Sequence, residues 1–151
     1  MSNWKDFAAA APELADFAFE RLDERLAYLA TVRADGAPRV HPVSPFIGEG
    51  HLFVYMEPNS PKARDLLRDP RYSLHCAVED SNGGEGELSV SGRARLVPDP
   101  EERAMVFSAA RAIGHSPQER YVVFELELSQ VLATTYASDK AHRRRWPERQ
   151  V

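Results

Sequence analysis

Polar and apolar residues alternate without interruption over residues 87–96 of the chain. Glu, Ser or Arg stands at each odd position, and the even positions hold Leu88, Val90, Gly92, Ala94 and Leu96. A period of two places successive side chains on opposite faces of a β-strand. The segment therefore predicts a strand that has one face on a hydrophobic core and the other face towards solvent.

Five further segments have the composition of strands, and some carry turn or edge signals. Asp35-Gly36 predicts a hairpin turn, because glycine tolerates the positive φ of such turns. Pro42 and Pro45 interrupt the segment that follows, which predicts an edge strand or a bulge. Another segment is apolar on both faces, as in a strand buried on both sides. The five segments are 26–32, 39–46, 51–56 (the segment apolar on both faces), 72–78 and 122–128.

Helices are predicted before and between these strands. Apolar residues recur at helical spacing over residues 14–22, shortly after Pro12. Ser60 and Asp99 are good N-cap residues, and each is followed by a proline suited to the first helical position. Trp4 and Phe7 precede the first helix and predict a separate docking segment.

The predicted strands follow one another in mostly sequential order, without regular alternation with helices. This order argues against a doubly wound α/β fold. It predicts a mainly β fold with peripheral helices, built around a small closed antiparallel barrel of six strands. A chain of 151 residues is the size of one domain. We therefore predict a single domain, with an N-terminal helical segment at 1–24 and a polar C-terminal tail at 137–151.

Composition excludes several classes of protein. The net charge of −4 gives no electrostatic reason to expect nucleic acid as the main partner, and the basic run 143–145 is predicted to be a solvated tail. Cys76 is the only cysteine, so no internal disulfide is possible. The chain has no apolar run of about 18 residues, which excludes a membrane-spanning helix. No signal-peptide pattern is visible at the N-terminus, so we expect a cytoplasmic location.

The chemistry-bearing residues form no catalytic constellation that could act by itself. The five histidines have no metal-ligand spacing. No nucleophile stands beside a base, and Cys76 lies in an apolar strand pattern, where an inert core cysteine is the usual finding. We therefore expect no catalytic side chain and no metal. If the protein is an enzyme, a bound cofactor supplies the chemistry.

The run Ser60-Pro61-Lys62-Ala63-Arg64 is the first candidate binding motif. The N-terminus of a helix offers backbone N–H groups and a positive dipole end, both suited to an anion. Lys62 and Arg64 add two cations within the same turn. The motif predicts a phosphate cradle. The alternative is an ordinary capped surface helix.

Residues 38–43 are the second candidate. Arg39 is a residue type that binds phosphate in a bidentate manner. The interruption at Pro42 leaves backbone groups unpaired at the strand, and a planar heteroaromatic ring can use them. The alternative is an edge strand with Arg39 and His41 at the surface.

Three ordered segments resemble the pyridoxamine 5'-phosphate oxidase-like split-barrel flavoproteins. They are Leu29 to Val43, Ser60 to Arg71, and the strand around Gly92, and Trp146 near the C-terminus is also common in that family. The resemblance implies a six-stranded antiparallel split barrel that binds FMN. It also implies a homodimer with two cofactor sites at the shared interface.

The resemblance implies roles for residues in three stretches of the chain. Four residues of the second strand would line the flavin and its ribityl chain, and three of the third strand would lie along the ring. The start of the short helix would hold the phosphate, and a C-terminal residue of the partner subunit would cover the ring. In that order the residues are Arg39, Val40, His41 and Pro42; Leu52, Val54 and Tyr55; Ser60, Lys62 and Arg64; and Trp146.

The implied activity is an FMN-dependent oxidoreductase that transfers hydride between the flavin and a small substrate near His41 and Tyr55. The chain is shorter than a true pyridoxamine 5'-phosphate oxidase, and an Arg-rich C-terminal substrate segment is not evident, so vitamin B6 oxidation is not expected. Three alternatives stay open. They are a reductase that uses a deazaflavin coenzyme, a non-catalytic flavin or haem carrier, and a dimeric scaffold without a cofactor.

Overall fold

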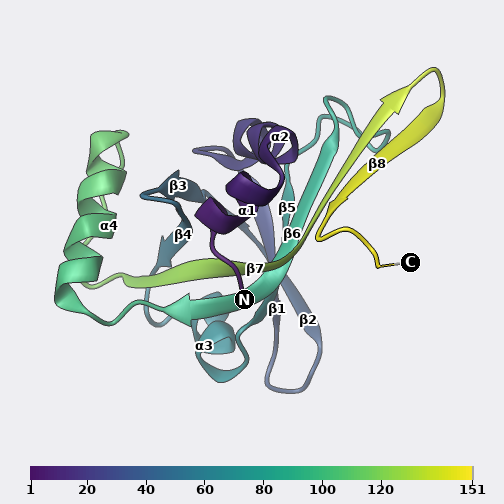
Figure 1. Ribbon diagram of the computed structural model, residues 1–151. Helices are drawn as coiled ribbons and strands as arrows, with labels where there is room; N and C mark the ends of the chain where they lie inside the picture. The colour runs from purple at the N-terminus through teal and green to yellow at the C-terminus, as the bar shows by residue number, and fades with distance from the viewer. Residues whose placement is uncertain (151) are drawn as a thin grey trace.

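A computed structural model describes residues 1–150 as one antiparallel sheet bordered by four helices (Figure 1). The fold class predicted from the sequence, mainly β with peripheral helices, is confirmed. The helices are α1 (Trp4–Ala10), α2 (Pro12–Leu22), α3 (Pro61–Arg68) and α4 (Pro100–Ala112). The strands are β1 (Ala27–Val32), β2 (Pro38–Val43), β3 (Phe46–Gly48), β4 (His51–Met56), β5 (Arg71–Cys76), β6 (Glu87–Leu96), β7 (Val122–Ala137) and β8 (Lys140–Trp146).

The eight strands are hydrogen-bonded in the order β2-β1-β5-β6-β7-β4-β3, and β8 pairs with β7 outside this path. Strand β7 joins β6 on one side to two strands on the other side. Its first residues pair with β4, and its last residues pair with β8. The sheet curls around a core that includes Leu29, Leu74, Val90 and Leu126. This curvature is that of a split barrel.

Strand number and closure differ from the sequence prediction. We predicted six strands in a closed barrel, whereas the sheet has eight strands and, within residues 1–150, its end strands β2 and β3 are not paired with each other. The predicted strand at 39–46 is divided, because β2 ends at Val43 and β3 begins at Phe46. Pro45 lies in this break and has no N–H to give to a ladder. The interruption therefore separates two strands on opposite edges of the sheet.

The predicted tail at 137–151 contains a strand instead. Ser138 and Asp139 both have positive φ, 52° and 59°, and they form the turn between β7 and β8. Strand β8 is almost entirely exposed and has no apolar face, so hydrophobic periodicity could not reveal it. Its backbone ladder with β7 holds it in place. The arginine run is consequently part of a hairpin and not a free tail.

The predicted helices and their caps are confirmed. Asp99 accepts the Glu102 N–H at 2.9 Å, and Trp4 and Phe7 are buried on α1, which packs beside α2. Strand β6 alternates as predicted, and its pairing with β7 has a bulge opposite Ser91 and Gly92, where Ser129 of β7 is skipped. A second apolar cluster lies under α4 and includes Phe53 of β4.

No helix within residues 1–150 is long and apolar enough to cross a bilayer. The same residues contain no group of three or more His, Cys, Asp or Glu side chains arranged to hold a metal ion.

Candidate functional site

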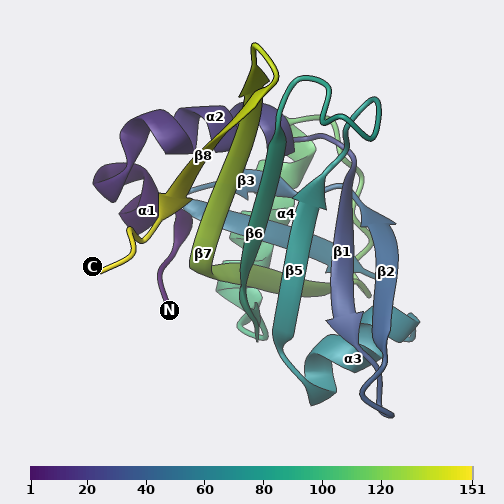
Figure 2. The same ribbon diagram turned by 90° about the vertical axis from the view of Figure 1, so that its right-hand side faces the viewer.

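The N-terminus of α3 lies beside β2 at one end of the molecule, next to the β1–β2 hairpin (Figure 2). Ser60 is the N-cap: its Oγ accepts the Ala63 N–H at 3.3 Å and donates to the Glu57 carbonyl at 2.8 Å. The hydroxyl therefore fixes the turn into the helix. Lys62, in the first turn, is half-buried, and Arg64 is exposed.

An ion pair joins β2 to α3. Arg39 donates from Nε to Asp65 Oδ2 at 2.7 Å. Asp65 is 3% exposed, and it also accepts from Thr31 at 2.8 Å and from Arg68 at 3.2 Å. Three donors from β1, β2 and α3 thus converge on one buried carboxylate. This arrangement holds Arg39 by a single nitrogen, and its two terminal nitrogens make no hydrogen bond within residues 1–150.

The surroundings of Asp65 keep it ionised. Burial by itself raises the pKa of a carboxyl group, because it disfavours the charged form. Here the hydrogen bonds from Thr31, Arg39 and Arg68 outweigh burial, and the pKa of Asp65 lies below its usual value. The carboxylate therefore stays charged at neutral pH and orients both arginines.

A hollow of about 360 Å³ opens at this junction. Four arginines and two aspartates line it, so its lining is net positive although the whole chain is negative. Such a lining favours an anion of phosphate size. The charged residues are Arg33, Arg39, Arg64, Arg68, Asp35 and Asp65.

His41 lies two residues after Arg39 on the same face of β2. Burial first, and then the nearby positive charges of Lys62 and Arg39, lower the pKa of His41 below its usual value, while Asp65 opposes them. The Nε2 atom of His41 is buried and has no hydrogen-bond partner within residues 1–150. A neutral imidazole with an unsatisfied nitrogen therefore stands beside the cations.

Strand β2 also presents a free backbone edge. Arg33 N–H bonds to the Ala37 carbonyl at 2.9 Å, and in antiparallel pairs such bonded positions recur every second residue. The paired register of β1 and β2 then turns the backbone of Pro38, Val40 and Pro42 away from β1. Because proline has no N–H, this edge offers three carbonyls and one donor, the N–H of Val40.

The side chains of Val40 and Pro42 lie on the opposite face of β2 from Arg39 and His41. Both are exposed, Val40 at 62%. Arg39 and Arg64 thus line the hollow at α3. Lys62 and His41 are outside its lining, and Lys62 lies close enough to His41 to lower its pKa. Val40 and Pro42 lie on the outer face of the sheet.

Three predicted residues of β4 lie elsewhere. Leu52 and Val54 are 0% and 2% exposed and belong to the barrel core. Tyr55 points to the other face, under α4, where its hydroxyl bonds to His115 Nδ1 at 2.9 Å and its ring stacks on Tyr121. The side chains of Leu52 and Val54 therefore support the strand and do not face the α3 hollow.

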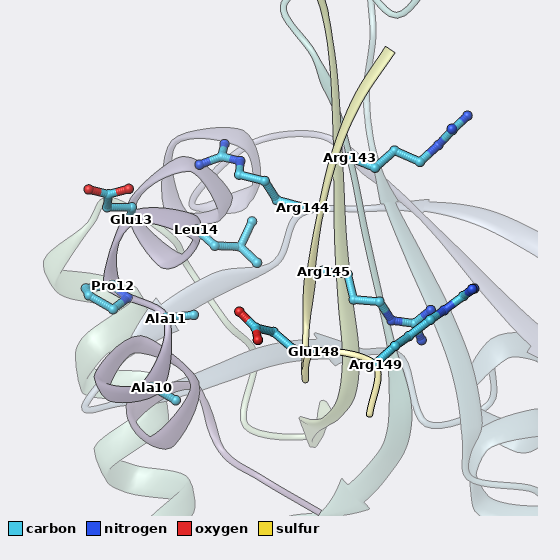
Figure 3. A pocket seen from close by; sticks show the side chains of 10 residues that line it. All are labelled: Ala10, Ala11, Pro12, Glu13, Leu14, Arg143, Arg144, Arg145, Glu148 and Arg149. Atoms are coloured by element: carbon cyan, nitrogen blue, oxygen red, sulfur yellow. The ribbon is translucent and has the colours of Figure 1, made fainter. Parts of the chain in front are cut away.

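Trp146 lies at the end of β8 and packs against Phe7, with ring centroids 5.2 Å apart. Beside it, a hollow of about 720 Å³ separates the α1–α2 corner from β8. Figure 3 shows that Arg144 points towards α2, whereas Arg143, Arg145 and Arg149 point to the opposite side. Cations that diverge do not form an anion site, so this hollow is a weaker candidate than the one at α3.

Asp65 is the central site residue that sequence reasoning missed. An aspartate inside the otherwise basic first turns of a helix was the available signal. Arg33 and Arg68 were missed for a similar reason, because they enter the site only when the β1–β2 hairpin packs beside α3.

Comparison with known families decides the classification of the chain. The family described as pyridoxamine 5'-phosphate oxidase matches residues 12–142, which is most of the sequence. The chain belongs to the pyridoxamine 5'-phosphate oxidase family. A comparison with curated proteins finds no match.

Several solved structures have a similar fold. A conserved hypothetical protein from Mycobacterium tuberculosis has a TM-score of 0.64 and 23% identity, with 82% of each chain covered. The haem storage protein HutZ from Vibrio cholerae has a TM-score of 0.61 and 22% identity, covering 80% of this chain and 92% of that one. An F420 reductase has a TM-score of 0.56 and 24% identity, covering 75% and 94%. At these identities the likeness shows the fold alone.

Proposed function

We propose that this protein binds FMN, with the phosphate at the N-terminus of α3 and the ring along the free edge of β2, and that it acts as a flavin-dependent oxidoreductase. The observation that carries the proposal is the ion pair of Arg39 with Asp65. It brings two segments that were separate candidates in the sequence to one net-positive hollow.

The residues fit the chemical groups of FMN. Lys62 and the free terminal nitrogens of Arg39 are suited to a phosphate. The carbonyls and the single N–H on the edge of β2 match a planar ring that carries both donors and acceptors. The buried, unpartnered Nε2 of His41 is a further polar group that a bound molecule would satisfy.

When bound, FMN would supply hydride transfer. The protein's own contribution would then be orientation and charge. Asp65 holds Arg39 in position, and the positive hollow neutralises the phosphate. His41 is uncharged at neutral pH, since its pKa is lowered, so it adds no further positive charge beside Lys62.

The outer face of the sheet supports assembly as a homodimer. No helix covers this face in Figure 2. Tyr28 pairs in register with Pro42 and with His75, and Val40 pairs with Ala30. Val40 is 62% and Tyr28 is 42% exposed, and an apolar strip of this kind marks a protein interface. We propose that a second copy covers this apolar strip on β1 and β2, which would place the β2 edges near the shared interface.

Two other cofactors are alternatives. One structure of similar fold is an F420 reductase and another is a haem storage protein. A deazaflavin coenzyme also carries a phosphate, so the α3 hollow would suit it equally. Visible absorption distinguishes the three chromophores.

The test is the visible spectrum of the purified protein, followed by titration with FMN and measurement of flavin fluorescence. We expect FMN to bind, and Lys62→Ala to weaken binding by about 1–3 kcal/mol because one charge-assisted contact is lost. Lys140→Ala, which removes an exposed lysine on the β7–β8 hairpin, is the matched control. FMN that fails to bind, or that binds both variants equally, would refute the proposed site.

A further inference from the structure

A second hollow lies on the other side of the β1–β2 turn from the α3 hollow. Its volume is about 590 Å³. It shares Arg33, Ala34 and Arg68 with the first hollow, and it adds Arg71 of β5 and Arg93 of β6. Together the two hollows are lined by six arginines and three aspartates. The arginines are Arg33, Arg39, Arg64, Arg68, Arg71 and Arg93, and the aspartates are Asp35, Asp65 and Asp69.

The arrangement of Arg71 and Arg93 is unfavourable by itself. They are directly opposite each other in the register of β5 and β6, and like charges at such positions destabilise a sheet. Both are exposed. The outer face of the sheet therefore carries two neighbouring cations at the rim of a hollow.

Of Arg71 and Arg93, only Arg71 has an acidic ion-pair partner within residues 1–150. Asp69 forms a bidentate ion pair with Arg71, at 2.7 Å from Nη2 to Oδ2 and 3.0 Å from Nε to Oδ1. This pairing, with a smaller effect of Arg93, lowers the pKa of Asp69 to about 2. Glu127 is opposite Arg93 on β7, but its carboxylate ion pair is with Arg95, at 4.0 Å. Within residues 1–150 Arg93 makes no ion pair.

We propose that this second hollow binds a small oxyanion, a carboxylate or a phosphate group, with Arg93 as its principal ligand and Arg33 as a second one. A bound anion would relieve the repulsion between Arg71 and Arg93. Arg33 is available to it, because among residues 1–150 its one ion pair is a 3.5 Å contact with the exposed Asp35. The inference rests on the second hollow alone and does not require FMN in the first.

The experiment is a titration of the ¹⁵N-labelled protein with sodium phosphate against sodium chloride of equal ionic strength, in which the arginine Nε–Hε resonances are followed. We expect saturable shifts at Arg71 and Arg93. Arg93→Gln should weaken this binding at least about fivefold, as expected for the loss of one charged hydrogen-bonding partner. Lys140→Gln, on the β7–β8 hairpin, is the control and should change nothing.

Separate variants keep the two hollows distinguishable. Lys62→Ala should weaken the response around α3 and leave the shifts at Arg71 and Arg93 intact. Arg93→Gln should weaken the saturable shift at Arg71 and leave the response around α3 intact. Arg71→Gln serves as a second variant if Arg93→Gln does not fold. Shifts at Arg93 that do not saturate, or that chloride reproduces, would overturn the inference, as would unchanged affinity in Arg93→Gln.

The oxyanion has two possible sources, and a comparison of FMN with FAD separates them. FAD continues beyond the FMN phosphate with a second phosphate. If Arg93→Gln weakens FAD binding but not FMN binding, the second hollow takes an anionic extension of the molecule held at α3. If neither affinity changes while the inorganic phosphate response is lost, the second hollow takes a separate anionic molecule.

Discussion

Arg39 on β2 donates from Nε to Oδ2 of Asp65 on α3 across 2.7 Å. The two residues are 26 positions apart in the chain, and Asp65 also binds Thr31 of β1 and Arg68 of its own helix. Through this one carboxylate the edge strand, the hairpin and the helix N-terminus form a single unit. The position of the cationic hollow depends on it.

Asp65→Asn should destabilise the fold. The change removes the charge that holds Arg39 and Arg68, and the side chain is buried, so we expect a loss of about 2–3 kcal/mol in the free energy of unfolding. Urea unfolding measures it. Asp16→Asn, at an exposed position of α2, should change stability by less than about 0.5 kcal/mol. Equal stability of the two variants would show that the buried ion pair does not hold β2 to α3.

The contribution of Asp65 should depend on pH with a defined sign. Its pKa in the folded protein lies below its ordinary value, so its stabilising effect is complete above the unfolded pKa of about 3.9. The effect is lost as pH falls through the lower folded pKa. The stability difference between the wild-type protein and Asp65→Asn should therefore be constant between about pH 5 and 7. It should shrink in more acidic buffers. A difference that grows on acidification contradicts this assignment.

Val40→Glu should disrupt the proposed homodimer. It places a charge at the centre of the exposed strip on β2 and β1, where Val40 pairs with Ala30. We expect the dimer dissociation constant to rise at least about tenfold, which corresponds to 1.4 kcal/mol. Light scattering after gel filtration, over a range of concentrations, gives the mass. Met105→Glu, at a half-exposed apolar position on α4, is the control and should leave the mass unchanged.

Gly92→Ala should be strongly destabilising. A Cβ at Gly92 would lie 1.9 Å from the backbone oxygen of Glu127, which cannot move without breaking the β6–β7 ladder. We expect a cost above about 3 kcal/mol, measured by thermal unfolding. Gly48→Ala is the matched control, because its Cβ would meet Ala109 at an ordinary 3.5 Å. A melting temperature for Gly92→Ala close to that of Gly48→Ala would show that the bulge can relax.

Trp146→Ala should lower stability, because the ring packs against Phe7 of its own chain. The site is only partly buried, so we expect a cost of about 2–3 kcal/mol, and Trp146→Phe should restore most of it. If Trp146 also covers the flavin of a partner subunit, Trp146→Phe should be stable and yet show altered emission of bound FMN. Unaltered emission would restrict the residue to packing within its own chain.

The parts of this fold that sequence reasoning predicted are those with local signals. Ser60 and Asp99 cap the helices that follow them, and a cap acts on backbone groups only two or three residues away. The alternation along β6 likewise reports a core face directly. The edge position of β2 followed from Pro42, since proline limits a strand to one neighbour.

The parts of the fold and site that sequence reasoning missed are held by contacts between distant segments or by backbone hydrogen bonds. Asp65 meets Thr31 at a separation of 34 residues, and no local pattern encodes such a meeting. Strand β8 is stabilised by hydrogen bonds to β7 and exposes nearly every side chain. Its turn uses Ser138 and Asp139 at positive φ, where a glycine would have been a clearer signal.

The free edge of β2 has a consequence for the behaviour of the chain in concentrated solution. An unpaired strand edge normally acts as a template on which another chain can add a strand, and this is a common route to aggregation. Between Pro38 and Pro42 this edge has a single N–H, that of Val40, so an incoming strand would find acceptors but almost no donors. The same two prolines that leave the edge open to a small molecule therefore protect it against strand addition.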